Sequence, residues 1–266
     1  MVSIIICFYE RLRHLKCCLD SLKFSVDDFD EIIITDDGSS EETVSSLKKM
    51  ISSYNFPIRH VWQEKKGFRL AASRNNGIRA AKGDYLIFLD CDFAILPGTI
   101  REHLRAAKRG RFVAGLCKYL PENETKNLFQ QELRPDSLVS LYASLSERPI
   151  TREHLKFIKY SILRRLHLVG PRKPQCSSHF SIHRKDMEYV NGYDENFVGW
   201  GGEDEDLSMR FLNAGIQGYS AISKAKVLHL WHPQELGGKH WREGPNVNYL
   251  YRKDIPFKCE NGLLKL

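Results

Sequence analysis

The sequence predicts a mixed α/β fold built on a mostly parallel sheet, and three observations support this. Short β-branched and apolar runs alternate with segments of helical periodicity through residues 1–90. Hydrophobic residues make up 42% and charged residues 27%, the composition of a globular protein rather than a disordered one. A chain of 266 residues can also bury a full core. We therefore expect one compact α/β domain.

The first half gives the clearest elements. Leucines recur at helical spacing between residues 12 and 22 among Arg, Lys and Asp side chains, which predicts an amphipathic helix. A second helix is expected after Ser40, and Gly83 follows the end of a third. The expected strands are Ser3–Phe8, Glu31–Thr35, Ile58–Trp62 and Tyr85–Leu89, and the third helix is Arg69–Lys82.

The second half is less regular. It contains no repeat, no low-complexity run and no evident linker. A loop-and-helix region is expected between Pro121 and Thr151, and a helix followed by Gly215 begins near residue 203. The expected elements are strands at Phe112–Tyr119, Ser177–Ile182 and Lys226–His229 and a helix at Glu203–Asn213.

Two acidic clusters follow predicted strands, Asp36-Asp37 and Asp90-Cys91-Asp92. Ligands of open α/β sheets bind beyond the carboxyl ends of the strands. Carboxylates separated by one extended residue point to opposite sides, so one could bind Mg²⁺ or Mn²⁺ while the other meets a ribose hydroxyl. Asp-Gly and Asp-x-Asp also form ordinary polar turns. Each cluster alone leaves both interpretations open.

A glycine-rich segment precedes the helix that begins near residue 203. Gly201 and Gly202 allow close backbone approach, and Trp200 offers a flat face for a sugar ring. Glu203 and Asp204 then begin the helix, where carboxylates also complement the helix dipole without any further role. A helix start needs no flexible glycine lead-in. We therefore predict that these two carboxylates belong to a site.

The next two acidic residues are predicted to lie mostly on the helix surface. Asp206 stands four residues before Arg210, a spacing that favours an ion pair. Glu205 beside it has no feature that indicates a site.

His229 and His232 stand at and just after the last predicted strand. A lone histidine is more often structural than a ligand. Two near a strand end, in a chain that also has an Asp-x-Asp segment, are better candidates, because imidazole readily completes a transition-metal shell.

A basic stretch at Arg152–Lys173 has two interpretations. Leucines and isoleucines are interleaved there with lysines and arginines. The stretch is either a solvated helix face or a surface that docks on anionic lipid or on a phosphorylated glycolipid acceptor. The net charge of +7 cannot choose between anionic partners.

Composition also bears on location. No run approaches the roughly 18 apolar residues of a membrane span. The residues that follow Met1 lack a basic region and a cleavage site, so no signal peptide is expected. Seven cysteines without close CxxC spacing predict reduced thiols and no zinc site. We expect a cytoplasmic protein, with the inner face of the cell membrane as a possible location.

At these motifs the chain resembles family 2 glycosyltransferases of the GT-A fold. Its Trp-Gly-Gly-Glu-Asp segment is also similar to the C-terminal motif of β-1,4-galactosyltransferases and bacterial chondroitin polymerases. The resemblance covers roughly residues 1–235 and is weakest over 120–175. It implies a single GT-A domain with a Rossmann-like, nucleotide-sugar-binding half at 1–95, an acceptor and catalytic half at 96–235 and a C-terminal tail at 236–266.

The resemblance implies roles for the residues that hold the nucleotide sugar. Tyr9 would lie against the uracil ring, and Asp37 would accept its N3 proton. Asp90 would contact the ribose or a metal-bound water. Arg69, Arg74, Asn75 and Cys91 complete the expected nucleotide-sugar contacts. In place of the Thr, Asn or Ser of many relatives, the first strand ends here with Cys7 and Phe8, which leaves open how the base is held.

The resemblance also implies the metal site and the catalytic group. Asp92 would ligate Mn²⁺ or Mg²⁺ together with His229, which matches the family's late histidine best, or with His232. Asp204 would be the catalytic base. Trp200, Gly201, Gly202 and Glu203 would hold the acceptor sugar.

The function implied is inverting, metal-dependent transfer of a hexose or N-acetylhexosamine. The donor would be a UDP-sugar and the acceptor a hydroxyl of a glycan or glycolipid, in bacterial surface polysaccharide or lipopolysaccharide synthesis. The alternative is a catalytically inactive glycan- or nucleotide-sugar-binding protein on the same fold. Nucleic acid is not an expected partner, because aromatic and basic residues do not alternate as a stacking platform requires.

Overall fold

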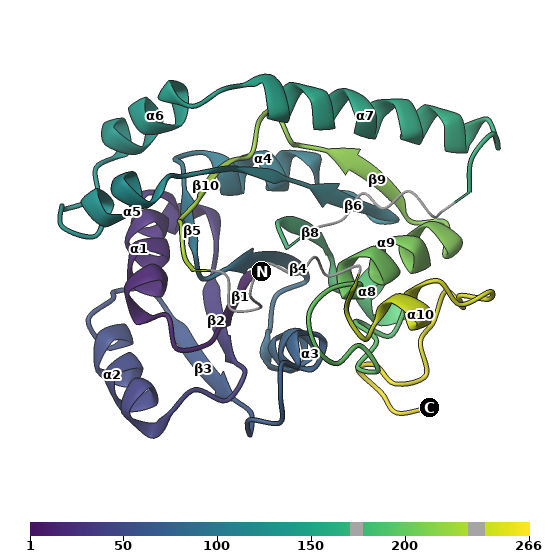
Figure 1. The fold of residues 1–266 in the computed structure, drawn as a ribbon, viewed down its shortest axis with the longest axis horizontal. Coiled ribbons are helices and arrows are strands. Elements are labelled where there is room, and N and C mark those ends of the chain that lie inside the picture. Colours follow the sequence, from purple (N-terminus) through teal and green to yellow (C-terminus); the bar gives the residue numbers. More distant parts are fainter. Residues whose placement is uncertain (171–177, 234–242) are drawn as a thin grey trace.

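The computed structural model describes residues 1–170, 178–233 and 243–266, and the strands in these residues form two sheets (Figure 1). The larger has seven strands in the order β3-β2-β1-β4-β8-β6-β9, and the smaller has the order β5-β10-β7. The strands are β1 (Val2–Phe8), β2 (Glu31–Asp36), β3 (Ile58–Trp62), β4 (Tyr85–Asp90), β5 (Phe93–Ile95), β6 (Arg111–Ala114), β7 (Leu116–Tyr119), β8 (Phe180–His183), β9 (Gln217–Ser220) and β10 (Lys226–His229).

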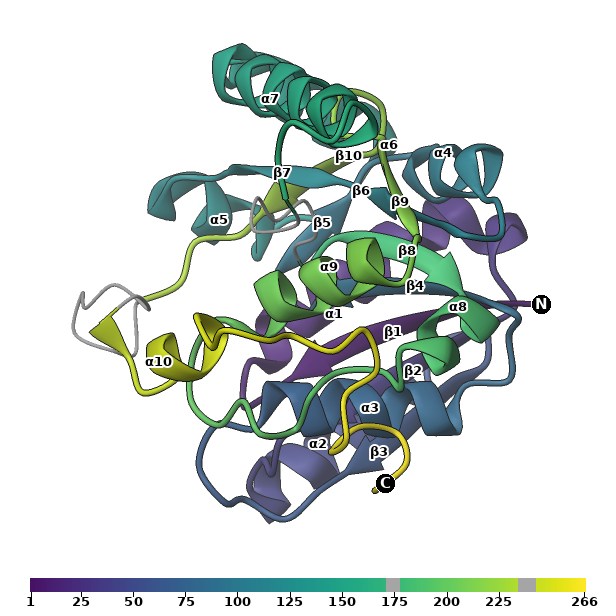
Figure 2. The same cartoon turned by 90° about the vertical axis from the view of Figure 1, so that its right-hand side faces the viewer.

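Helices flank the large sheet on both faces, with α3 on one side and α1 and α2 on the other (Figures 1 and 2). The helices are α1 (Leu12–Leu22), α2 (Glu41–Ile51), α3 (Leu70–Ala80), α4 (Thr99–Ala106), α5 (Glu122–Leu128), α6 (Pro135–Ser144), α7 (Arg148–Arg165), α8 (Arg184–Tyr189), α9 (Glu203–Asn213) and α10 (Val247–Leu250), with a 3-10 segment, η1, at Lys23–Asp28.

Strand direction confirms the α/β class. The four strands β3, β2, β1 and β4 are parallel, β8 runs antiparallel between β4 and β6, and β6 pairs in parallel with β9. A parallel sheet covered on both faces buries every residue of its central strands. In β1, Ile4 and Ile6 pack on the side of α1 and α2, whereas Ile5 packs with Ile78 of α3. This alternation explains why the strand is a continuous apolar run.

Sequence reasoning located most elements of the first half, and two of the second, closely. The bounds of β3, α9 and β10 are as predicted, and those of β1, β2 and β4 differ by one residue. The prediction of a single strand at Phe112–Tyr119 is wrong. The chain divides at Gly115 into β6 in the large sheet and β7 in the small one. A Cβ at Gly115 would lie 2.3 Å from Nδ1 of His179, so only glycine allows this backbone approach.

Six further elements, η1, β5, α4, α8, β9 and α10, were not expected. They are short, and β9 is largely polar and partly exposed, so neither length nor periodicity separated them from loops. The expected strand at Ser177–Ile182 appears as β8, Phe180–His183, and residue 177 lies outside the described residues.

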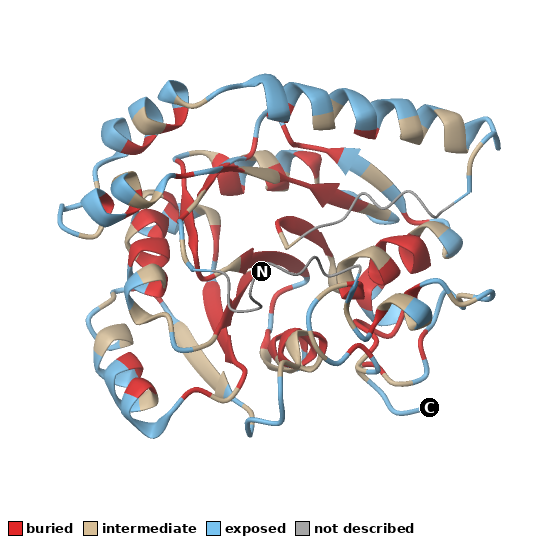
Figure 3. Ribbon diagram, viewed as in Figure 1, coloured by how far each residue is buried: buried red, intermediate tan, exposed pale blue. Residues whose placement is uncertain are grey.

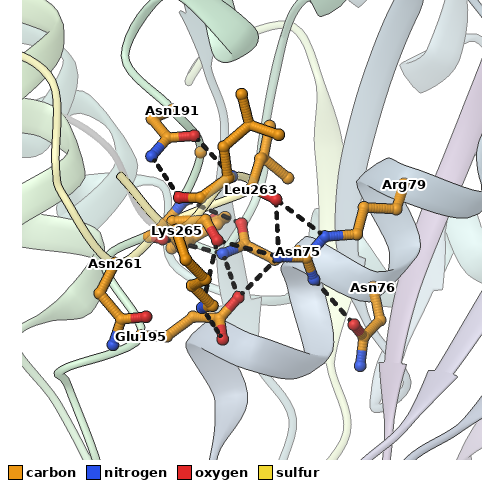
Figure 4. Close-up of polar contacts among 12 residues, drawn as sticks. Asn75, Asn76, Arg79, Asn191, Glu195, Asn261, Leu263 and Lys265 are labelled. Carbon is orange, nitrogen blue, oxygen red and sulfur yellow. Dashed lines mark hydrogen bonds and ion pairs between the residues drawn. The ribbon is translucent and has the colours of Figure 1, made fainter.

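The segment 243–266 returns to the start of the loop that leads into α9 (Figure 4). The amide nitrogen of Asn191 donates to the carbonyl oxygens of Cys259 and Leu264, both at 2.8 Å. Lys265 Nζ lies 2.7 Å from a carboxylate oxygen of Glu195, and Arg79 of α3 donates to the Leu263 carbonyl at 3.1 Å. The tail thus joins this loop to α3.

Two further expectations concern helices and thiols. Within residues 1–170, 178–233 and 243–266, every helix is too short or too polar to cross a bilayer. The six cysteines among these residues are free, and Cys176 lies outside them.

Candidate active site

A carboxylate and two imidazoles meet where the two sheets adjoin. Asp92 follows β4, and the antiparallel pairing of β5 with β10 brings His229, opposite Phe93, to the same place. The Nε2 atoms of His232 and His229 lie 3.3 Å and 3.7 Å from the two carboxylate oxygens of Asp92. One ligand atom from each residue falls within 4.8 Å of the others. The structure thus brings together all three predicted metal ligands.

This cluster fits a divalent cation. Within the described residues, Asp92 Oδ1 is buried without a hydrogen-bond partner. Burial would raise the pKa of Asp92, but the hydrogen bond with His232 and the charges of the two histidines outweigh it, so this pKa is lowered. Arg11 Nη1 lies 3.2 Å from the other carboxylate oxygen. One carboxylate with two imidazoles suits a transition ion such as Mn²⁺ better than Mg²⁺, which prefers an all-oxygen shell.

Arg74 of α3 joins the donor-side strand end to the helix that begins at Glu203. Its fully buried guanidinium lies 2.8 Å from Asp204, 3.5 Å from Glu203 and 3.5 Å from Asp90. Its Cζ atom lies 5.1 Å from the ring centroid of Tyr193, whose hydroxyl donates to Asp204 at 3.4 Å. The Arg74 guanidinium therefore contacts all three of these predicted site carboxylates, an arrangement that sequence reasoning had not foreseen.

The three carboxylates around Arg74 differ in environment. Burial, and next the charge of Asp204, raise the pKa of Glu203 to about 7. Its Oε2 is buried without a hydrogen-bond partner in the described part of the chain. Burial also raises the pKa of Asp90, although Arg74 opposes the change. The side chain of Asp204 keeps 22% of its surface exposed and can meet a ligand.

The glycine segment before α9 needs its glycines. Gly202 caps the helix with a φ of +95°, and a Cβ there would lie 2.9 Å from the Phe197 ring. Gly201 also has a positive φ, and its carbonyl accepts from the buried amide of Asn246 at 2.9 Å. With this support Trp200, three residues before Glu203 in the chain, remains 41% exposed. Such a face can stack on a sugar ring.

The residues predicted to bind the base of the nucleotide lie near Asp37, which follows β2. Asp37 accepts from the amide nitrogen of Gln63 at 2.6 Å and from the backbone N–H of Arg69 at 2.8 Å. Lys65 Nζ lies 3.7 Å from Asp37 and 3.4 Å from the ring centroid of Tyr9. The Arg69 guanidinium donates to the carbonyl of Glu64. Tyr9, Asp37 and Arg69 are thus brought together, whereas Arg74 lies with the three carboxylates described above.

Two predicted nucleotide contacts have other tasks in this structure. The amide nitrogen of Asn75 donates to the Tyr193 carbonyl at 2.8 Å and to Glu195 at 2.9 Å, while its oxygen accepts from the Tyr193 N–H at 2.9 Å (Figure 4). Asn75 therefore holds the loop before α9. Cys91 is buried in the core between the sheet and α1, and burial raises the pKa of its thiol.

The prediction that Asp206 lies mostly on the helix surface is wrong. The expected ion pair with Arg210 is present at 2.6 Å, but both side chains are fully buried. Arg252 adds a second ion pair with Asp206 at 2.8 Å. The (i, i+4) spacing identified the partner, but burial depended on the C-terminal segment, which periodicity does not reveal.

Sequence reasoning missed four residues that contact the site. Arg11 stands two residues after Tyr9 at a strand end, a position that could have indicated it. Lys65, Tyr193 and Asn246 lie in loops without any local motif. They reach the site through pairings across the fold.

Comparison with known proteins agrees with this arrangement. Residues 3–188 match the model of glycosyl transferase family 2, and residues 162–233 match that of the N-terminal domain of galactosyltransferase. The chain belongs to glycosyl transferase family 2. This confirms that it is related to enzymes that transfer sugars.

Three curated relatives illustrate the similarity. Validoxylamine A glucosyltransferase of Streptomyces hygroscopicus subsp. jinggangensis is 30% identical over 81% of this chain and 52% of its own length. Chondroitin synthase of Escherichia coli is 27% identical over 99% and 40%. Hyaluronan synthase of Pasteurella multocida is 25% identical over 86% and 25%. The chain thus spans about half, or less, of the length of these relatives.

Solved structures confirm the GT-A fold. GalNAc-T7, crystallised with UDP, GalNAc and Mn²⁺, matches with a TM-score of 0.60 at 17% identity over 88% of this chain and 44% of its own. The mannosyltransferase PcManGT from Pyrobaculum calidifontis, in complex with GDP-Man and Mn²⁺, matches with a TM-score of 0.58 at 14% identity over 88% and 58%.

Proposed function

We propose that this glycosyltransferase moves a hexose or N-acetylhexosamine from a UDP-sugar to a hydroxyl of a glycan, with inversion at the anomeric carbon. The observation that carries the proposal is the link made by Arg74. It connects Asp90 at the donor-side strand end with Asp204 on α9. A transferase must hold donor and acceptor within bonding distance. Arg74 contacts one carboxylate from each of the two proposed halves. The donor half would be residues 1–95 and the acceptor half residues 96–235.

Tyr9, Asp37 and Arg69 form the proposed base-binding end. Asp37 has a carboxylate suited to accept an N–H of the base, and its hydrogen bonds to Gln63 and the Arg69 backbone hold it in place. Asp90 would meet the ribose. GalNAc-T7 carries UDP and PcManGT carries GDP-Man, so this fold accepts either base. A carboxylate can accept the N3–H of uracil or the N1–H of guanine, so the choice of a UDP-sugar follows the family resemblance of the Asp37 segment.

Asp92, His229 and His232 would hold a divalent cation, for which Mn²⁺ suits the donor set best. Two structural neighbours bind Mn²⁺ with their nucleotides. Such an ion supplies Lewis-acid neutralisation of the charge that develops on the departing diphosphate. Both histidines are near enough to Asp92 to serve, so we propose both as ligands.

Asp204 is the proposed base. As the acceptor oxygen attacks the anomeric carbon, its proton passes to the Asp204 carboxylate, and the bond from that carbon to the diphosphate oxygen breaks. Arg74 and Tyr193 hold the carboxylate in one orientation. A single displacement with one base inverts the anomeric centre. Trp200 and the Gly201–Gly202 turn would seat the acceptor ring, with Glu203 bonding to a hydroxyl.

The relatives named as chondroitin and hyaluronan synthases support a polysaccharide or glycolipid acceptor, as in bacterial surface polysaccharide or lipopolysaccharide synthesis. The cytoplasmic side of the membrane, where sugar nucleotides are made, is the proposed location. A catalytically inactive binding protein would not need both Asp92 with its two histidines and Asp204 held by Arg74, and this argues against that alternative.

The test is a screen of UDP-sugars for donor hydrolysis and transfer with Mn²⁺. We expect turnover with at least one donor, loss of turnover in EDTA and recovery when Mn²⁺ is restored. Asp92→Asn should lower activity by at least about 100-fold. Asp136→Asn, an exposed carboxylate on α6, is the matched control and should have no effect. Full activity in chelator would refute the metal assignment.

A further inference from the structure

Helix α7 and the residue that follows it, Leu166, present a row of apolar side chains to solvent. Only Ile150 and Phe157 are buried among its 18 residues. A surface helix normally directs its apolar stripe into the core. Here four apolar residues face outward instead, with exposed fractions of 61%, 40%, 51% and 60% for Leu155, Ile158, Ile162 and Leu166.

These four residues form one continuous stripe. They are spaced by three, four and four residues, which places them on the same side of a helix. At a rise of about 1.5 Å per residue, the stripe is about 16 Å long. Helix α7 lies along the outer edge of the molecule, and most of its visible surface is exposed (Figures 1–3).

Positive charge borders the stripe on both sides. Helical spacing places Lys159 and Arg152 on one side and Arg165 on the other. Lys159 and Arg165 have no ion-pair partner within residues 1–170, 178–233 and 243–266. The helix has six basic residues and one acidic residue, so it carries +5 of the formal net charge of +7.

We propose that the outer face of α7 docks on an anionic lipid bilayer. The leucines and isoleucines would enter the boundary between headgroups and acyl chains, and the flanking lysines and arginines would contact anionic headgroups. An apolar stripe bordered by Lys and Arg is the pattern of helices that lie in the membrane interface. Each basic side chain near such a surface gains further attraction.

Charge argues against the other occupants of this face. A second copy would bring two strongly positive helices together, and like charges repel. The cores of protein–protein interfaces are depleted in lysine, whereas this stripe is narrow and bordered by it. An anionic surface neutralises the charge and covers the stripe at once.

The test is co-flotation of the whole chain with vesicles. One set contains phosphatidylcholine alone and the other phosphatidylcholine mixed with phosphatidylglycerol. We expect binding only to the anionic vesicles, with a decrease as salt rises. Lys159→Glu/Arg165→Glu and, separately, Leu155→Ser/Ile162→Ser should each reduce the bound fraction about tenfold. All four side chains are exposed, so the fold should persist, as circular dichroism would verify.

The matched control is Lys48→Glu/Lys49→Glu on α2, which makes the same change of charge at two exposed positions away from α7. It should keep most of the binding. Equal losses in the α2 and α7 charge variants, or no binding to anionic vesicles, would overturn the proposal. So would a dimer in size-exclusion chromatography that Leu155→Ser/Ile162→Ser dissociates. Flotation uses no donor sugar, so its failure is distinct from a failure of the proposed function.

Discussion

Two fully buried arginines, Arg74 and Arg210, contact carboxylates on the same helix, yet their surroundings differ. Arg210 pairs with Asp206 at 2.6 Å, and neither side chain has any exposed surface. Arg74 pairs with Asp204 at 2.8 Å, but that carboxylate is 22% exposed. The same chemistry is closed to solvent in one place and open in the other. The closed pair contributes to the fold, and the open pair remains available for a reaction.

The helix geometry explains how residues so close in sequence are divided. Asp204 and Asp206 are two positions apart, or about 200° around α9, so they point to opposite sides. One side faces the strand ends and Arg74. The other faces Arg252 and the carbonyl of Val190, to which Arg210 donates at 2.9 Å.

The largest expected effect comes from Asp204→Asn. The variant keeps the shape of the side chain but cannot accept a proton, so kcat/KM should fall by about 10²–10⁴-fold. Donor affinity, measured by calorimetry with a UDP-sugar and Mn²⁺, should stay within about twofold. Near-normal turnover would show that another group is the base. Arg74 keeps Asp90 and Glu203 as partners, so the variant should fold.

Asp206→Asn tests the closed pair. Removing one charge leaves Arg210 buried with an incomplete partner, which costs about 3–5 kcal/mol. Urea unfolding should show this loss of stability, while turnover per folded molecule stays close to that of the unmodified chain. An unchanged unfolding midpoint, or a turnover loss as large as that of Asp204→Asn, would remove the distinction between the two pairs.

The smallest predicted effect concerns pH. Burial, and next the charge of Asp204, raise the pKa of Glu203 from 4.5 to about 7, so the folded protein keeps a proton that the unfolded chain releases. The stability from this group is complete below the unfolded pKa and is lost as pH rises through the folded pKa. Relative to Glu203→Gln, the unmodified chain should lose on the order of 2 kcal/mol between about pH 5 and about pH 8. If the free energy of unfolding changes with pH by the same amount in both proteins, the raised pKa of Glu203 is contradicted.

The sequence was most informative where local rules determine the structure. Apolar runs predicted β1, β2 and β4. Because parallel strands end at one edge of a sheet, these strands also predicted where Asp37, Asp90 and Asp92 lie. Glycines before α9 predicted an unusual turn, and Gly202 has the left-handed conformation that only glycine adopts easily.

Sequence reasoning failed where a residue's task depends on a distant partner. Arg74 lies 130 residues from Asp204, and nothing in its helix indicates that contact. The contacts of Asn75 were equally unpredictable from the local sequence, because its partners stand near residue 193. The division at Gly115 depends on the ring of His179. Local patterns predicted which residue types belong near the site, but only the fold assigns them to contacts.

The contacts between residues 243–266 and the loop before α9 have a consequence for the order in which parts of the structure form during synthesis. Strands β1 to β4 leave the ribosome before the loop that precedes α9, and Tyr9, Asp37 and Arg69, the proposed base-binding residues, lie in the connections between these strands. The loop before α9 gains its supports only after Asn246 and residues 259–265 have also been synthesised. Because N-terminal segments generally fold first, a nascent chain would acquire its nucleotide platform well before the turn around Trp200 is fixed. The proposed transfer of sugar would then become possible only after the proposed binding of the nucleotide.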